Sequence, residues 1–211
     1  MTTVARGAQA PQARRLIGLA AVVALAFVGL RLVGGVNIGG ADPALGDGVI
    51  FTSERYGYSV TVPADFERFE IPGTWAAGES PVVNGPGSDV YSGPGSIDVR
   101  TDMVVWSQAV GTETSLDAFL ADYDALMSGS AGSCSGILTT GPLTIGGESA
   151  RFTTHECPDG AGTVAFAVHE AVVLHGERAY VIALAAPPAS LSDAERGDLF
   201  ESILATFSFS D

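Results

Sequence analysis

The apolar stretch from Leu16 to Val36 decides which solvent the rest of the chain meets. Residues 16–30 carry no charge, and the whole stretch of 21 residues contains one charged side chain, Arg31. As a helix, a stretch of this length extends about 31 Å, which is the thickness of a bilayer core. Arg31 lies about one turn from its end, where a long side chain can reach the lipid headgroups. We therefore predict a transmembrane helix over residues 16–36.

The charges on either side of this stretch give its orientation. Residues 1–15 contain three arginines and no acidic residue, whereas Asp42 and Asp47 follow the stretch. Positively charged flanks stay on the cytoplasmic side of a membrane. We therefore predict a cytoplasmic N-terminus over residues 1–15 and an extracellular C-terminal part, which makes the apolar stretch a single-pass signal-anchor.

Cleavage by a signal peptidase is the alternative fate of the apolar stretch. Gly39 and Ala41 supply the small residues that such a cut requires, and cleavage after Ala41 releases a secreted protein. The apolar run is longer than the roughly 7 to 15 residues usual for a signal peptide, so we favour a retained anchor. Both outcomes export the C-terminal part.

The exported part has the size and charge of one acidic domain. Residues 37–48 form a short glycine-rich tether, and residues 49–211 are sufficient for one hydrophobic core. The chain contains no lysine; all 24 acidic residues and six of its ten arginines follow residue 40, which leaves a net charge near −18 there. Such a charge repels phosphate backbones and anionic lipids, so we exclude nucleic acid as a partner.

Two cysteines, Cys134 and Cys157, are expected to form a disulfide, because an even cysteine count in an exported chain is typical of disulfides. A disulfide that closes the loop between Cys134 and Cys157 stabilises the fold by about 3.4 kcal/mol. A metal site is the alternative, since His155 lies two residues before Cys157 and shares its face of a strand. The chain has no C-x-x-C or H-x-x-x-H spacing, so we predict no metal and no other cofactor.

Alternating and helical periodicities after residue 48 predict an α+β domain. The pattern of Thr114 and Asp117 indicates the start of the first helix, a capping box of Ser192 and Glu195 starts the second, and Gly146-Gly147 forms a tight turn. Strands are predicted over residues 49–52, 58–62, 97–106, 143–145, 149–157, 164–174, 179–185 and 207–209, and helices over 112–128 and 192–204.

The arrangement of these elements follows from their patterns. The strand over residues 179–185 is apolar on both faces, so it is placed at the centre of a sheet that is covered on each side. The strand over residues 97–106 alternates and is predicted to be half-buried. We expect a mostly antiparallel, twisted sheet covered by two helices and preceded by one membrane helix.

Residues 72–96 are predicted to be a long loop, because they contain four prolines and six glycines among 25 residues. Trp75 and Tyr91 are the candidate partner-binding residues, since exposed aromatic side chains on loops often contact ligands. We favour the alternative, in which the loop is a flexible insertion whose aromatic rings fold back onto the body of the domain and bury their area.

Three segments resemble the PsbP-like superfamily, an α/β/α sandwich. They are Tyr58–Phe66, an aromatic strand running into proline and a turn; Ile145–Ala150, a glycine-containing hairpin; and Phe200–Phe209, a helix running into a strand. The resemblance spans about residues 49–209 and implies the fold of exported bacterial members whose role is unassigned. Unlike lipoprotein members, this chain has no cysteine near the end of its apolar stretch, so a helical anchor replaces the lipid.

The sequence contains no G-x-S-x-G, H-E-x-x-H, P-loop or Rossmann motif. His169 and Glu170 are neighbours on a strand and therefore point to opposite faces, so they cannot act on one atom. We predict no enzymatic activity and no catalytic residue. The expected function is a membrane-tethered, extracytoplasmic binding or assembly domain for another cell-envelope protein or a small ligand. The alternative is an extracytoplasmic hydrolase or metal-dependent enzyme whose site is assembled from distant residues.

Overall fold

The computed structural model describes most of the chain after residue 44: residues 45–79, 81, 85–96, 99–129, 134–158 and 162–210. The predicted cytoplasmic segment and transmembrane helix, and most of the predicted tether, lie outside the described residues. Within the described ranges, no helix is both long and apolar enough to cross a membrane.

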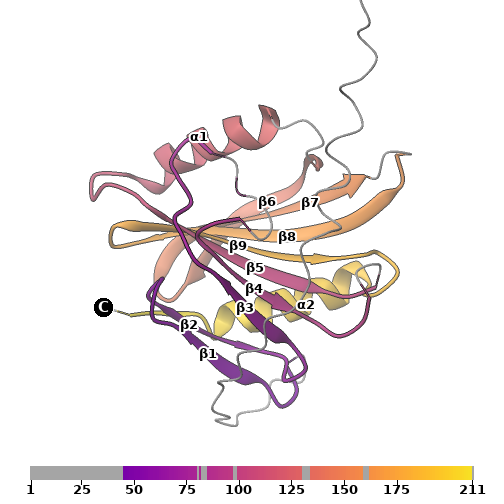
Figure 1. Ribbon diagram of the computed structural model, residues 1–211. Coiled ribbons are helices and arrows are strands. Elements are labelled where there is room, and N and C mark those ends of the chain that lie inside the picture. The colour runs from indigo at the N-terminus through magenta and orange to yellow at the C-terminus, as the bar shows by residue number, and fades with distance from the viewer. Residues whose placement is uncertain are drawn as a thin grey trace, which may run out of the picture.

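Two antiparallel sheets and two helices form the domain (Figure 1). The large sheet has seven strands in the order β3-β4-β5-β9-β8-β7-β6, and the small sheet has three in the order β1-β2-β10. The elements are β1 Val49–Ser53, β2 Tyr58–Val62, β3 Glu67–Ile71, β4 Ser88–Ser92, β5 Asp102–Ala109, α1 Leu116–Gly129, β6 Ser135–Ile145, β7 Glu148–Pro158, β8 Val164–His175, β9 Arg178–Ala186, α2 Asp193–Ala205 and β10 Ser208–Phe209.

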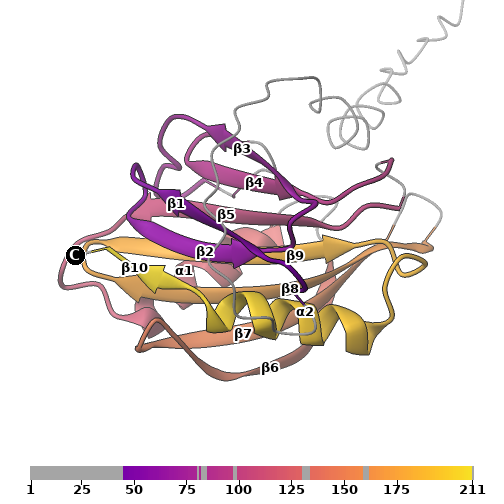
Figure 2. The ribbon, with the colours of Figure 1, turned by 90° about the horizontal axis from the view of Figure 1, so that it is seen from below.

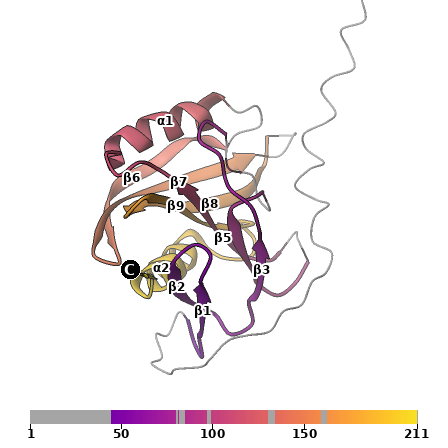
Figure 3. The ribbon, with the colours of Figure 1, turned by 60° about the vertical axis from the view of Figure 1, so that its left-hand side comes forward.

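The large sheet is covered on both faces. Helix α1 lies over one face, and α2 lies with the small sheet over the other (Figures 1, 2 and 3). Strand β9 occupies the centre, where Tyr180, Ile182 and Leu184 pack in the core under the small sheet and α2. Val181 and Ala183 pack in the second core under α1. The α+β class, the antiparallel sheet, its two covering helices and the central strand are all as the sequence predicts.

Local sequence explains where several elements begin and turn. Gly146 and Gly147 have φ values of 56° and 89°, which suit the two-residue turn between β6 and β7. The predicted capping box is present: Ser192 and Glu195 exchange side-chain and backbone hydrogen bonds at the start of α2. The predicted cap of α1 is wrong by one residue, because Ser115, not Thr114, accepts a hydrogen bond from the Ala118 backbone N–H.

The predicted loop over residues 72–96 contains a buried strand, β4, which pairs with β3 on one side and β5 on the other. All five of its residues, including Ser88, Asp89 and Ser92, are buried. The next strand, β5, begins at Asp102 rather than residue 97 and is covered on both faces rather than one. The loop prediction failed here because a core strand of serine and aspartate between Gly-Pro pairs has no apolar periodicity.

A buried hydrogen-bond network explains why β4 carries polar residues. The Tyr58 hydroxyl on β2 donates to Asp89 Oδ2 at 2.6 Å and lies 2.9 Å from the Tyr91 hydroxyl. Arg68 on β3 donates from Nη2 to Asp89 Oδ1 at 2.9 Å. Asp89 is fully buried, and both of its carboxylate oxygens are paired. The network therefore joins the small sheet to the large one through a charge that water does not reach.

Replacing Asp89 with alanine is expected to lower the free energy of unfolding by about 3 to 5 kcal/mol, because the buried Tyr58 hydroxyl loses its carboxylate acceptor and the partly buried Arg68 guanidinium keeps only a longer contact, 3.4 Å, with the carboxylate of Glu70. Urea denaturation measures this loss. Asp65→Ala removes an exposed carboxylate from the nearby turn and is the matched control, with an expected change within about 0.5 kcal/mol. Equal effects of the two substitutions would show that the network contributes nothing.

All five tyrosines of the chain have pKa values above the usual one, because burial disfavours the phenolate. They are Tyr56, Tyr58, Tyr91, Tyr123 and Tyr180. The folded state therefore keeps these protons at pH values where the unfolded chain releases them. The contribution of the buried tyrosines to the stability of the fold is therefore fully present below the unfolded pKa of about 10. It is lost as the pH rises from there through the higher pKa values of the folded state.

An alkaline titration followed by phenolate absorbance tests this pH dependence. At a pH of about 10.5, most tyrosines of the urea-unfolded chain are ionised, whereas the folded chain is expected to show almost no phenolate. Phenolate should then appear together with the loss of secondary structure as the pH rises further. Stepwise ionisation of a folded chain near pH 10 would contradict the predicted burial.

Candidate functional site

Strand β7 presents a row of polar side chains to α1. Successive residues of a strand point to opposite faces, so Arg151, Thr153, His155 and Cys157 share one face. Thr153 lies directly opposite Glu170 on β8, which places Glu170 on the same face. The prediction that His155 and Cys157 share a face is therefore confirmed, and the structure adds a buried carboxylate to them.

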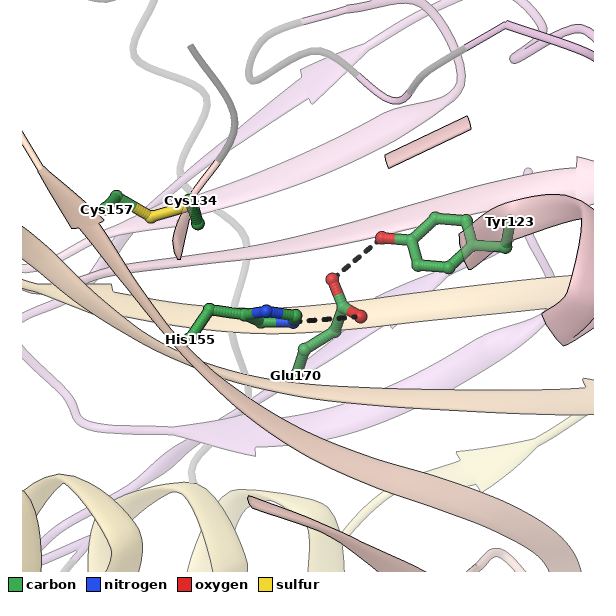
Figure 4. Close-up of a disulfide and its surroundings, with 5 residues drawn as sticks. All are labelled: Tyr123, Cys134, His155, Cys157 and Glu170. Atoms are coloured by element: carbon green, nitrogen blue, oxygen red, sulfur yellow. Dashed lines mark hydrogen bonds and ion pairs between the residues drawn. A yellow bond between two sulfur atoms is a disulfide. The ribbon is translucent and has the colours of Figure 1, made fainter. Parts of the chain in front are cut away.

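Glu170 is the centre of this group (Figure 4). The Tyr123 hydroxyl on α1 donates to Glu170 Oε2 at 2.7 Å, and His155 Nε2 lies 3.7 Å from Glu170 Oε1. Burial, followed by the nearby Glu170 charge, raises the pKa of Tyr123 well above its usual value. Tyr123 is therefore a neutral hydrogen-bond donor to the carboxylate at physiological pH. We call Tyr123, Asp124, Arg151, Thr153, His155 and Glu170 the polar cluster.

An ion pair fixes α1 above the polar cluster. Arg151 donates to Asp124 Oδ2 from Nη1 and to Asp124 Oδ1 from Nη2, both at 2.6 Å. These hydrogen bonds raise the pKa of Arg151, and the charge of Glu170 raises it further. A bidentate pair holds both side chains in one geometry. The helix is thereby positioned so that Tyr123 meets Glu170.

Several buried atoms of the polar cluster have no hydrogen-bond partner. They are Arg151 Nε, Thr153 Oγ1, His155 Nε2 and Glu170 Oε1. The side chain of Glu170 is 6% exposed and that of His155 is 17% exposed. Unpaired buried polar atoms are rare in folded proteins, and each costs about 1 to 3 kcal/mol. Four of them in one cluster indicate a site that receives a polar group.

Cys134 and Cys157 form a disulfide, as predicted. It joins the chain that follows α1 to β7, next to His155 (Figure 4). Both sulfurs are occupied by this bond, so they are not thiolate ligands for a metal with His155. Among the described residues, no three histidine, cysteine, aspartate or glutamate side chains converge as a metal ion would require.

The other histidines lie away from the polar cluster. His169 faces α2, between the rings of Phe152 and Phe200, with Nε2 at 3.4 Å from Asp193 Oδ1, and burial lowers its pKa. It points away from Glu170, as the alternation of the strand predicts. His175 stacks on Phe209 at the end of β8 and contacts Glu148 at 3.1 Å. Of the three histidines, His155 is the one beside the partly unpaired carboxylate.

The two predicted partner-binding aromatics are not on the surface. Tyr91 is fully buried in β4, and Trp75 is 3% exposed. Trp75 packs edge-to-face against Phe119 and Tyr123 of α1, and its Nε1–H donates to the Glu79 carbonyl at 2.7 Å. The hypothesis that these rings are exposed is wrong, and the favoured alternative is correct for both rings: the segment folds back over the sheet and buries their area. Trp75 instead supports Tyr123 within the site.

Comparison with solved structures places this fold among known ones. Cyanobacterial PsbP from Synechocystis sp. superposes with a TM-score of 0.56 at 12% sequence identity, covering 82% of this chain and 98% of that protein. A protein from Bacteroides thetaiotaomicron superposes with a TM-score of 0.50 at 16% identity, covering 77% of this chain; the chain spans about half of that protein, 48%.

A third structure, a protein of unknown function from Pseudomonas aeruginosa, has a TM-score of 0.47 at 11% identity and covers 75% of this chain and 94% of that protein. At these identities the likenesses concern the fold alone. No protein-family model matches the sequence. No curated protein matches it by sequence.

Removing the disulfide with Cys134→Ser and Cys157→Ser is expected to lower the free energy of unfolding by about 3 kcal/mol, because the unfolded chain regains the freedom of the closed loop. Urea denaturation of the variant measures this loss, and unfolding of the parent chain under a reductant should give the same midpoint. Native chain that titrates with two free thiols, or a variant of unchanged stability, would contradict the prediction.

Proposed function

We propose that this domain, which has a PsbP-like fold, is a non-catalytic binding or assembly domain that acts outside the cell membrane. In this proposal, residues 16–36 anchor it, residues 1–15 lie in the cytoplasm, and residues 37–48 tether the domain to the membrane. Its partner is another cell-envelope protein or a small ligand.

The observation that carries the proposal is the α1 face of β7, where a disulfide lies beside the polar cluster. Disulfides persist in oxidising compartments and are rare in the cytoplasm, which supports export. The cluster supports binding, because Glu170 and His155 lie on adjacent paired strands and each still has a buried polar atom without a hydrogen bond. A site that is already built needs little ordering when a ligand arrives.

The contacts within the polar cluster favour binding over hydrolysis. His155 Nε2 and Glu170 Oε1 are 3.7 Å apart, which is beyond hydrogen-bond distance. A histidine that acts as a general base is held in place by a hydrogen bond to its partner carboxylate. Tyr123 also keeps its proton to high pH, so it donates a hydrogen bond rather than acting as a base.

The charge of the domain supports a position held off the lipid surface. Five of the six arginines after residue 40 pair with carboxylates: Arg55, Arg68, Arg100, Arg151 and Arg196. The exposed surfaces of both helices carry aspartate, glutamate, alanine and serine but no arginine. Anionic headgroups repel such a surface. A flexible tether of the predicted length reaches about 20 Å, which leaves room for a partner.

Protease treatment of intact cells tests this topology. The full-length chain with a C-terminal tag should remain in the membrane fraction, and external protease should remove the tag without lysis. An Ala41→Asp variant blocks the predicted alternative cleavage; release of the parent chain but not of this variant into the medium would support the secreted form. A tag that resists protease until the cells are lysed would overturn the proposal.

A further inference from the structure

We infer that the polar cluster binds a primary ammonium group; this inference rests on the proposed binding function and names its ligand class. The cluster lies between α1 and strands β7 and β8, where Glu170 Oε1, Thr153 Oγ1 and His155 Nε2 are buried and unpaired. Thr153 is 1% exposed and Glu170 is 5% exposed. Thr153 and Glu170 lie opposite each other on β7 and β8, and His155 Nε2 is 3.7 Å from Glu170 Oε1, so the three side chains share the face of the sheet under α1.

The number and type of unpaired atoms match an ammonium group. A carboxylate oxygen and a threonine hydroxyl accept hydrogen bonds, and a neutral imidazole nitrogen accepts one in the appropriate tautomer. An alkylammonium has three N–H donors and no acceptor, so it can satisfy all three atoms at once. An anion is unsuitable, because Glu170 repels it and the guanidinium of Arg151 already holds both oxygens of Asp124.

The charge balance of the cluster points the same way. The charged and titratable groups that face the site are Tyr123 and Asp124 from α1, Arg151 and His155 from β7, and Glu170 from β8. Tyr123 is neutral, so apart from the imidazole of His155 one guanidinium meets two carboxylates. A buried carboxylate without a full counter-charge is unfavourable, and one further positive charge would balance the group.

No side chain of this protein supplies an ammonium group, because the sequence contains no lysine. Its arginine in the cluster is held by Asp124, and Arg55, Arg68, Arg100 and Arg196 pair with carboxylates elsewhere. The ammonium therefore comes from another molecule, either a small free amine or the lysine side chain of a partner protein. Both present the same group on an unbranched stem.

Calorimetric titration of the full-length chain at a moderate salt concentration tests the inference. The probes are n-butylammonium, Nα-acetyl-lysine amide and butyltrimethylammonium, the last of which carries the same charge without an N–H donor. Saturable binding of either primary amine, at least tenfold tighter than that of the trimethyl probe, supports the inference. A response to butylammonium alone assigns the site to small amines, and a response to the lysine amide as well admits a partner's lysine.

Two variants and one control locate the binding. Glu170→Gln and Thr153→Val should each weaken amine binding at least tenfold while the chain stays folded. If Glu170→Gln does not fold, the amine affinity of Thr153→Val alone tests the inference. Glu201→Gln removes an exposed carboxylate from α2 and should leave binding unchanged.

Equal weakening by all three variants, or no binding of any amine, would overturn the inference. If amine binding fails while external protease still removes the tag, only the ligand class is wrong and the tethered binding domain stands.

Discussion

Strand β9 has apolar side chains on both faces, and the rest of the domain is arranged to keep both of them from water. Tyr180, Ile182 and Leu184 need cover on one side, and Val181 and Ala183 need it on the other. One amphipathic helix cannot supply both, so α1 covers one face while α2 and the small sheet cover the other. Burying apolar area on both faces is the main stabilising term, and it dictates a three-layer arrangement.

Two buried carboxylates on opposite faces of the large sheet show how the domain separates structure from function. Asp89 lies under the small sheet, where Tyr58 and Arg68 pair both of its oxygens. Glu170 lies under α1, where Tyr123 donates a hydrogen bond to one oxygen and the other accepts none. A fully paired buried charge specifies one arrangement of the core, whereas a partly paired one has affinity left for a ligand.

The disulfide and the Arg151–Asp124 ion pair both connect β7 to the segment that contains α1 and the residues after it. One joins the chain after α1 to the end of β7, and the other ties the middle of α1 to the centre of β7. Together these two connections hold α1 against the face of the sheet that carries the polar cluster. The helix therefore both covers apolar surface and positions the hydroxyl that holds Glu170 in place.

Much of the fold was predictable from local patterns, because periodicity and turn chemistry act within a few residues. The Gly146-Gly147 turn, the capping box of Ser192 and the two-faced apolar strand were all read correctly. Strand β4 was missed, because its serines and Asp89 enter the core only when Tyr58 and Arg68, from two other strands, meet them. The sequence of β4 alone does not indicate that Tyr58 and Arg68 are its partners.

The candidate site divides in the same way. Spacing alone placed His155 and Cys157 on one face of a strand, and cysteine count together with an apolar leader predicted the disulfide. Glu170 was considered only beside His169, and its contact with Tyr123 was not identified, since these two residues lie 47 positions apart in the sequence.

The sequence by itself determined the class of the fold, the disulfide pair and the acidic charge, because these depend on composition and on neighbours along the chain. Only the tertiary structure decided that Trp75 and Tyr91 are core residues and that His155, Glu170 and Tyr123 form one site. Contacts between distant segments follow from how the layers pack, and packing is a property of the whole chain.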